Sequence, residues 1–323
     1  MQDFFIKWYS TLDKPISFLR HLPYITTFFR FSLRTVANFS LTIYYLALKG
    51  NEKQCIRENI DQLESERPRI IVSLTSFPKR INRLWLVIEI ILRQSKKPDL
   101  VVLWLSKKQF ASLDSLPKKL LKLQELGLKI VLVDEDYRSH KKYYYVLKEY
   151  PNDFIITVDD DIFYSKHLIA SLWKKHIEFP EAIICNYAFQ IERNDDNSNA
   201  PYEKWKQLEV GTAPSSEIFF GSGGGTLFTP GSLHEDALKP ELFLKLCLHA
   251  DDIWLNTMVR LNNKKIAKAD LLATILPLQY NDNSTLATIN LIEGQNDKQL
   301  ALVRDFYIQK QNLDPYKSEK HYQ

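Results

Sequence analysis

The chain contains few cysteines, and those it has form no recognisable pattern. Cys55, Cys185 and Cys247 are far apart, their number is odd, and no CxxC pair or Cys/His cluster occurs. This spacing gives no support for a disulfide framework or for a Cys/His zinc site. We therefore expect reduced thiols and a cytoplasmic location.

Sequence motifs that define several common enzyme classes are also missing. The chain has no HExxH, no GxSxG and no GK[ST] after a glycine-rich loop, so metalloprotease, serine-hydrolase and P-loop chemistry have no support. The acidic stretches lack the glycine and distant glutamate of an EF-hand, which argues against a calcium loop. A net charge of only +4, without a basic helix carrying interleaved aromatics, argues against nucleic acid as a partner.

Long hydrophobic runs are absent too. The longest uncharged run of residues 1–50, from Thr35 to Leu48, has 14 residues, whereas a spanning helix needs about 20 and a signal peptide has a different charge order. Residues 1–50 carry six basic and two acidic side chains, 6 − 2 = +4, which equals the net charge of the whole chain. Basic residues mixed with aromatics are typical of helices in a membrane interface, but also fit a helical extension that packs on the main domain. Pro15 and Pro23 predict that the segment is not one continuous helix.

From residue 69 onward the sequence alternates between strand and helix patterns. Apolar, β-branched runs predict strands at 99–106, 128–134 and 155–158, and a strand followed by a loop at 69–77. Helical periodicity predicts helices at 81–95, 117–126 and 141–150. Such alternation indicates an α/β fold with a mostly parallel sheet flanked by helices. Ligands bind such sheets at the carboxyl ends of the strands. Thr75–Ser76, Asp134–Asp136 and Asp159–Asp161 are all expected at that edge.

Three consecutive aspartates, Asp159 to Asp161, follow the fourth strand. If the chain stays extended there, Asp159 and Asp161 point to one side and Asp160 to the other. Paired carboxylates of this kind suit Mg²⁺ or Mn²⁺, which commonly takes one or two protein carboxylates and completes its shell with substrate phosphates. The alternative is a solvated turn with an aspartate capping the next helix. The strand context favours the metal site.

Two further stretches carry polar or glycine-rich patterns. Six of the nine glycines lie between Gly211 and Gly231, where backbone N–H groups could approach a ligand or the chain could make a tight crossing. Asp251 and Asp252 precede an amphipathic helix pattern. They can cap that helix, and one of them can also act as a general base toward an acceptor hydroxyl.

Taken in order, these segments resemble the nucleotide-sugar glycosyltransferases of the GT-A fold, and most of all the bacterial family 2-like enzymes of capsule, exopolysaccharide and lipopolysaccharide synthesis. The resemblance spans roughly residues 69–300. It is carried by IVSLTSFPKRI (71–81), KPDLVVLWLS (97–106), SHKKYYYVLKEYP (139–151), IITVDDDIFY (155–164), FGSGGGTLF (220–228), ADDIWLN (250–256) and GQNDKQL (294–300). The ordered set is specific, whereas any one piece is not. Residues 1–50 are not part of it.

The resemblance implies roles for the matched residues. Asp161 and Asp159 would hold Mn²⁺ or Mg²⁺, and Gly223, Gly224 and Gly225 would border the acceptor and donor. Asp251 or Asp252 would be the catalytic base, with Asp252 preferred. The nucleotide sugar would be bound by Thr75, Ser76, Arg80, Lys142, Asp159 and Asp160.

The expected activity is therefore metal-dependent transfer of a sugar from a nucleoside-diphosphate donor to a hydroxyl of a glycan or lipid-linked acceptor, with inversion. The expected place is the cytoplasm, with peripheral contact at the inner face of the cell membrane. Two rival interpretations stay open, a sugar nucleotidyltransferase and a non-catalytic carbohydrate-binding relative. The first would usually have a glycine- and lysine-rich loop after its first strand, and SLTSFPKR has no glycine.

The expected domain organisation has three parts. Residues 1–65 form a helical, basic and aromatic extension, residues 66–303 form the GT-A-like, Rossmann-related domain, and residues 304–323 form a polar tail.

Overall fold

A computed structural model describes residues 1–18, 23–48, 67–272, 275–279 and 294–317. Within this part of the chain, the centre of the molecule is a seven-stranded sheet with the order β11-β6-β10-β4-β1-β2-β3. The strands are β1 (Ile70–Thr75), β2 (Leu100–Ser106), β3 (Leu128–Val133), β4 (Phe154–Val158), β6 (Ile183–Cys185), β10 (Gly224–Phe228) and β11 (Ile266–Lys268). Only β10 runs against its neighbours in this sheet. The prediction of a mixed α/β fold with a mostly parallel sheet is confirmed.

The first four strands form where the sequence predicts them, because their apolar residues serve two cores at once. In β1, Ile70 and Val72 belong to the core on one face of the sheet and Ile71 to the core on the other. In β2, Val101 and Val102 divide in the same way. A strand covered on both faces needs a nearly continuous apolar run, as these sequences have.

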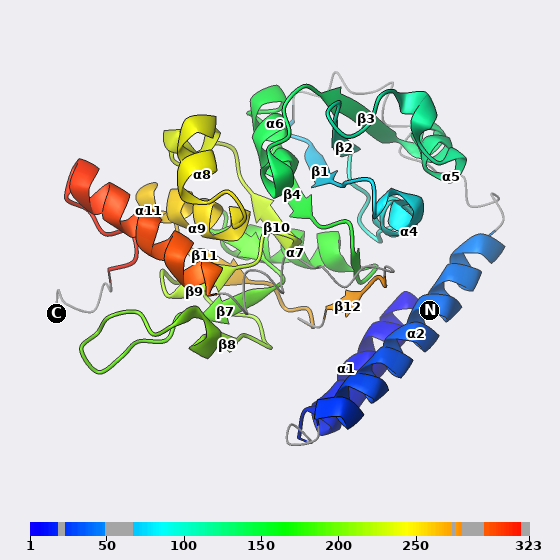
Figure 1. The fold of residues 1–323 in the computed structure, drawn as a ribbon, viewed down its shortest axis with the longest axis horizontal. Coiled ribbons are helices and arrows are strands. Elements are labelled where there is room, and N and C mark those ends of the chain that lie inside the picture. Colours follow the sequence, from blue (N-terminus) through cyan, green and yellow to red (C-terminus); the bar gives the residue numbers. More distant parts are fainter. Residues whose placement is uncertain (19–22, 49–66, 273–274, 280–293, 318–323) are drawn as a thin grey trace.

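Helices cover both faces of the sheet (Figure 1). One face carries α4 (Ile81–Leu92), α5 (Lys118–Leu121) and α7 (Leu168–Glu178), and the other carries α6 (Lys141–Glu149), α8 (Pro240–Leu246), α9 (Asp251–Leu261) and α11 (Gln295–Gln311). The predicted helix at 117–126 is α5 followed by a 3₁₀ segment, Lys122–Leu126. It ends at Gly127, whose φ of 104° lies in the left-handed region that favours glycine.

Two small sheets lie beside the main one. In one, β5 (Ile162–Phe163), which directly follows the aspartate triplet in the sequence, pairs with β12 (Leu276–Pro277). In the other, β7 (Ala188–Gln190) lies between β8 (Lys206–Gln207) and β9 (Ile218–Phe220). The backbone of Ser215, just before β9, also pairs with Ile266 of β11, which links this small sheet to the main one.

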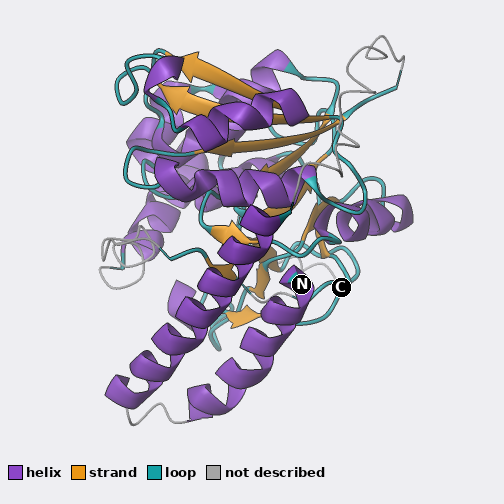
Figure 2. Ribbon diagram, turned by 90° about the vertical axis from the view of Figure 1, so that its right-hand side faces the viewer, coloured by secondary structure: helices purple, strands orange, loops and turns teal. Residues whose placement is uncertain are grey.

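The N-terminal segment forms two helices that lie side by side, α1 (Gln2–Phe18) and α2 (Pro23–Ala47) (Figures 1 and 2). The segment is thus not one helix, as predicted; Pro23 begins α2, whereas Pro15 lies within α1. One side of this pair packs on the main domain. Asn38 donates from Nδ2 to the carbonyl of Pro277 at 3.0 Å, and its Oδ1 accepts from the backbone N–H of Gln279 at 2.8 Å.

Of the two predicted domain boundaries, one lies outside the described residues and the other lies inside a helix. The limit between 65 and 66, and most of the polar stretch 51–69, lie outside them, as does Cys55. Cys185 and Cys247 are buried free thiols. The limit between 303 and 304 falls inside α11, and Tyr307 and Tyr316 beyond it are buried against the domain. Among the described residues, no helix has the length and apolar character to cross a membrane.

Candidate functional site

The aspartate triplet lies in a turn just after β4, which ends at Val158. Asp160 is buried and receives two hydrogen bonds from the loop after β1. Ser76 Oγ donates to Asp160 Oδ2 at 2.6 Å, and an Arg80 nitrogen donates to Asp160 Oδ1 at 2.6 Å. The same Arg80 nitrogen lies 2.8 Å from Asp161 Oδ2. Because the chain turns here, Asp160 and Asp161 both reach Arg80, and the strict alternation expected for an extended segment does not apply.

Arg80 is therefore the first positive partner of the triplet. It precedes α4, and its side chain is largely buried. Burial opposes its charge, but Asp160 and Asp161 raise the pKa of the guanidinium above its ordinary value. Burial also raises the pKa of Asp161, to about 7, against the opposing effect of Arg80 and with the help of the neighbouring carboxylates. One arginine thus does not fully neutralise the triplet.

Lys142 is the second positive partner, and it links two acidic groups that are distant in sequence. It lies in the first turn of α6 and is 2 % exposed. Its Nζ is 2.7 Å from Asp159 Oδ1 and 2.9 Å from Asp251 Oδ2. Burial opposes its charge, but Asp159, Asp251 and Asp252 raise the pKa of the ammonium group above its usual range. The aspartate triplet and the Asp251–Asp252 pair therefore belong to one site.

The two aspartates at the start of α9 are held differently. Asp251 is buried, and its Oδ2 accepts from Ser222 Oγ at 2.6 Å as well as from Lys142. Asp252 is half-buried, and its Oδ1 accepts from the backbone N–H of Ser222 at 2.7 Å. No described group donates a hydrogen bond to Asp252 Oδ2. One oxygen of Asp252 is thus available to a ligand.

These contacts move the two pKa values in opposite directions. Burial works against the ionised form of Asp251, but Lys142, His140 and Ser222 overcome it and hold the pKa of Asp251 well below its usual range. Burial and the charge of Asp251 raise the pKa of Asp252 to about 7. Asp251 is a fixed anion, whereas Asp252 is poised to take up a proton near neutral pH.

The glycine cluster lets the chain approach the triplet closely. A Cβ on Gly223 would lie 1.7 Å from Asp159 Oδ2, and a Cβ on Gly224 would lie 2.3 Å from the Cβ of Tyr187. Gly225 has a φ of +95° and packs against Leu168. Glycines 223–225 are all buried. Gly223 therefore directly shapes the site, while Gly224 and Gly225 serve packing behind it.

The remaining predicted residues have structural partners. Thr75 donates from Oγ1 to the carbonyl of Trp104 at 2.8 Å, so its hydroxyl joins β1 to β2. Asp134 pairs with Lys107 on the surface, and Asp136 pairs with the buried Lys141. The ion pairs of the Asp134–Asp136 group are thus made with Lys107 and Lys141, whereas those of the triplet are made with Arg80 and Lys142.

Two site residues were not singled out by the sequence. Ser222 holds both aspartates of the α9 pair, and a serine within a glycine-rich run was the available signal. Tyr164 accepts from the backbone N–H of Asp159 at 2.7 Å, and its hydroxyl also contacts the carbonyl of Gly223. Its place three residues after the triplet offered no comparable signal.

The charge balance of this cluster fits a divalent cation. Five carboxylates (Asp159, Asp160, Asp161, Asp251 and Asp252) are in contact with, or adjacent to, two cations (Arg80 and Lys142), which gives 2 − 5 = −3 if all are ionised. Within the described residues no group of three or more His, Cys, Asp or Glu side chains is placed so that it could hold a metal ion by itself. The two more exposed carboxylates, Asp159 and Asp161, are hard oxygen donors in the number that Mg²⁺ or Mn²⁺ takes when a diphosphate supplies the rest.

No family model matches the chain, and no curated protein sequence matches it. The fold is similar to a solved structure described as mannosyltransferase PcManGT from Pyrobaculum calidifontis in complex with GDP-Man and Mn²⁺, with 14% sequence identity and a TM-score of 0.46. That alignment covers 88% of this chain and 76% of the other. Functional inference therefore depends on the residues of this chain.

Proposed function

We propose that this protein is a metal-dependent glycosyltransferase that moves a sugar from a nucleoside-diphosphate donor to a hydroxyl of a glycan or lipid-linked acceptor, with inversion. The observation that carries the proposal is the position of Lys142, within 2.7 Å of Asp159 and 2.9 Å of Asp251. It joins the acidic turn after β4 to the aspartate pair of α9. A leaving-group site and a base are thereby brought to the same edge of a parallel sheet, where such sheets bind ligands.

The donor would bind over the turn after β4. Asp159 and Asp161 would hold Mn²⁺ or Mg²⁺, which stabilises the negative charge of the departing diphosphate. Arg80 and Lys142 lie next to these carboxylates, so each cationic side chain can also interact with the phosphates when the donor binds. Asp160, held by Ser76 and Arg80, positions that arginine rather than contacting the donor.

The acceptor hydroxyl would meet Asp252. The Ser222 N–H holds Asp252 Oδ1, which leaves Oδ2 to accept the proton of the hydroxyl. The oxygen then attacks the anomeric carbon from the side opposite the diphosphate, so the configuration inverts in a single displacement. A pKa near 7 suits this step, because the carboxylate is ionised often enough at neutral pH and still binds the proton well. Asp251 does not compete, since Lys142 and Ser222 hold its pKa well below its usual range, which makes it a weak base.

The proposed setting is cell-surface polysaccharide synthesis at the cytoplasmic face of a membrane, with residues 1–50 in peripheral contact with it. Helices α1 and α2 support this setting. They pack on the domain through one side and leave aromatic side chains exposed on the other.

A panel of nucleotide sugars tests the reaction class. The full chain is incubated with each nucleotide sugar and Mn²⁺, without acceptor, and the products are separated. Slow release of nucleoside diphosphate from one donor is expected, because water can replace the acceptor. A nucleotidyltransferase would instead form nucleoside triphosphate and sugar 1-phosphate, and only when pyrophosphate is added to the donor. No product from any donor, with or without pyrophosphate, would indicate a binding protein.

A further inference from the structure

Helix α2 exposes an apolar surface along its whole described length. We call it the outer face, and all its members have more than two-fifths of their surface exposed. They are Tyr24, Ile25, Phe28, Phe29, Phe31, Val36, Phe39, Ile43 and Leu46. A single exposed apolar residue needs no explanation, but a continuous face of this size usually marks an interaction site.

The outer face carries no charge. At 100° per residue, its members spread over about 160° of the helix circumference, and from Tyr24 to Leu46 they extend about 33 Å. The charged residues of α2 are Arg30 and Arg34, and both turn toward α1. Arg30 Nε lies 2.6 Å from Asp13 Oδ1, and Arg34 Nε donates to the hydroxyl of Tyr9 at 2.8 Å.

The opposite side of α2 is fixed to the domain. Ala37, Leu41 and Tyr45 are buried, and Asn38 bonds to both Pro277 and Gln279. In α1, Gln2 donates from Nε2 to the carbonyl of Tyr164 at 3.0 Å. The helix pair is therefore held against the β5–β12 sheet, in which β5 directly follows the aspartate triplet, and its outer face keeps a set orientation to the candidate site.

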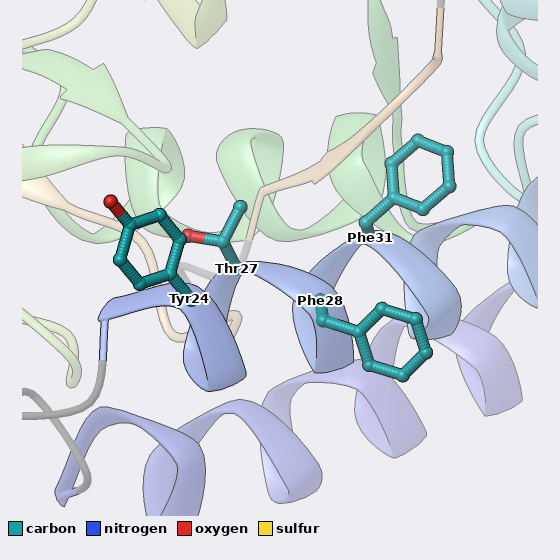
Figure 3. Close-up of a pocket in the computed structure, with 4 residues that line it drawn as sticks. All are labelled: Tyr24, Thr27, Phe28 and Phe31. Carbon is teal, nitrogen blue, oxygen red and sulfur yellow. The ribbon is translucent and has the colours of Figure 1, made fainter.

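Figure 3 shows the first turns of the outer face. Tyr24, Thr27, Phe28 and Phe31 line a shallow hollow, with Tyr24 and Phe31 on the side of α2 nearer the main domain and Phe28 on the near side in this view. The rings stand away from the helix backbone and do not pack into one another across the hollow. Such a surface can accept flexible chains between its rings.

We propose that the outer face lies on the surface of a lipid bilayer that contains anionic lipids. Its breadth exceeds the narrow a/d stripe by which one helix recognises another. Ser32 and Thr35 lie within the same arc, but their hydroxyls donate to the carbonyls of Phe28 and Phe31 in the same helix. Aromatic rings next to a basic segment are the composition of helices that lie in the interface. Residues 1–50 carry a net charge of +4, which is complementary to anionic headgroups. This inference extends the proposed location but not the proposed chemistry, so it can fail while sugar transfer stands.

Vesicle flotation tests the proposal with the full chain. Phosphatidylcholine vesicles with and without phosphatidylglycerol are mixed with the protein and floated through a density gradient. The protein should float with the phosphatidylglycerol vesicles, less with phosphatidylcholine alone, and less at high salt. The variant Phe28→Ser/Phe39→Ser should lower the partition coefficient by about tenfold or more, because two large rings no longer enter the interface.

A matched control removes similar apolar surface elsewhere. Ile177 in α7 and Leu302 in α11 are both exposed, and both lie outside the helix pair. Ile177→Ser/Leu302→Ser should float like the original protein, and both double variants should keep its thermal unfolding midpoint. Equal flotation of the two double variants, or no flotation of the original protein, would overturn the proposal. So would a stable dimer by sedimentation equilibrium that Phe28→Ser/Phe39→Ser dissociates, because a second copy would then cover the face.

Discussion

The aspartate triplet after β4 and the aspartate pair of α9 place charge in the same site. Their less buried carboxylates, which we call open (Asp159 and Asp161 in the triplet, Asp252 in the pair), have different surroundings. In each group one buried member contacts both a hydroxyl and a cation, Asp160 at Ser76 and Arg80, and Asp251 at Ser222 and Lys142. In the triplet, the open carboxylates also touch cations, Asp161 at Arg80 and Asp159 at Lys142. In the pair, Asp252 Oδ1 accepts from the backbone N–H of Ser222, and the neutral Ser222 is its hydrogen-bond donor in the described part of the chain.

This difference separates two chemical tasks. A carboxylate that pairs with a cationic side chain lies where positive charge is stabilised. A metal ion can take the place of that side chain, as binding by a metal ligand requires. A carboxylate with a neutral donor on one oxygen and a free second oxygen can bind a proton and pass it on. The predictions below test that separation one carboxylate at a time.

The largest effect is expected at Asp161. Asp161→Ala should abolish Mn²⁺-dependent sugar transfer, because one of the two exposed carboxylates of the triplet is lost. The unfolding midpoint should stay close to that of the original protein, since burial already opposes ionisation of Asp161. Product formation is measured over a Mn²⁺ titration. Full activity in this variant would remove the proposed metal site.

The matched variant Asp160→Asn should behave in the opposite way. Asp160 is the buried acceptor of Ser76 and Arg80, so its loss should lower the free energy of unfolding by about 1–3 kcal/mol. The dependence of activity on Mn²⁺ concentration should shift less than in Asp161→Ala. If both variants lost metal dependence equally, the division of the triplet into a held and an open carboxylate would be wrong.

The next largest effect is expected at Asp252. Asp252→Asn should lower kcat for transfer by about 10²–10⁴, the usual contribution of a general base. Binding of the nucleotide-sugar donor, measured without turnover, should remain, because the aspartate triplet is unchanged. Since a raised pKa means that the ionised form is disfavoured in the fold, this variant should also be as stable as the original or more stable above pH 7. Unchanged kcat would leave Asp252 without a catalytic role.

Lys142 should have a smaller effect on rate but a clear one on stability. Lys142→Met leaves Asp251 buried without its cation, and breaking such a pair costs about 3–5 kcal/mol of unfolding free energy. Lys141→Met is the matched control, because Lys141 is also buried and paired, but burial already lowers the pKa of its ammonium group. The control should lose less stability in urea unfolding. Equal losses would show that Lys142 has no special place between the two acidic groups.

The sequence predicted one half of the fold better than the other. Strands β1 to β4 and their helices depend on local apolar runs and periodicity, which a single sequence shows. The insertion of β10 between β4 and β6 depends on pairing between strands about seventy residues apart, such as Thr226 with Thr157. Nothing in the local pattern of residues 186–228 indicates the separate β7–β8–β9 sheet, because its strands have only two or three residues each.

The candidate site divides in the same manner. The position of Asp159–Asp161 at the end of a buried strand is a local property and could be predicted. The pairing of the aspartates could not be predicted, because Arg80, Lys142 and Ser222 come from three separate segments that meet only in the folded chain. The resemblance named Arg80 and Lys142 as residues that bind the nucleotide sugar, not as ion-pair partners of the aspartates. Asp160 had no assigned partner in the sequence, since strand alternation only places it on another side. The turn after Val158 brings it to Ser76 and Arg80 instead.

The smallest predicted effect is a dependence of the rate on pH. Burial and Asp251 raise the pKa of Asp252 to about 7, and only the ionised form accepts the acceptor proton. The rate constant kcat/KM for transfer should therefore rise with pH, falling by about tenfold for each unit below pH 7 and levelling above it. In Asp252→Glu the slope should persist, because a carboxylate is still present, whereas in Asp252→Asn the residual rate should lose it. A slope that survives in Asp252→Asn would assign the titrating group to another residue and remove the contrast between the two acidic groups.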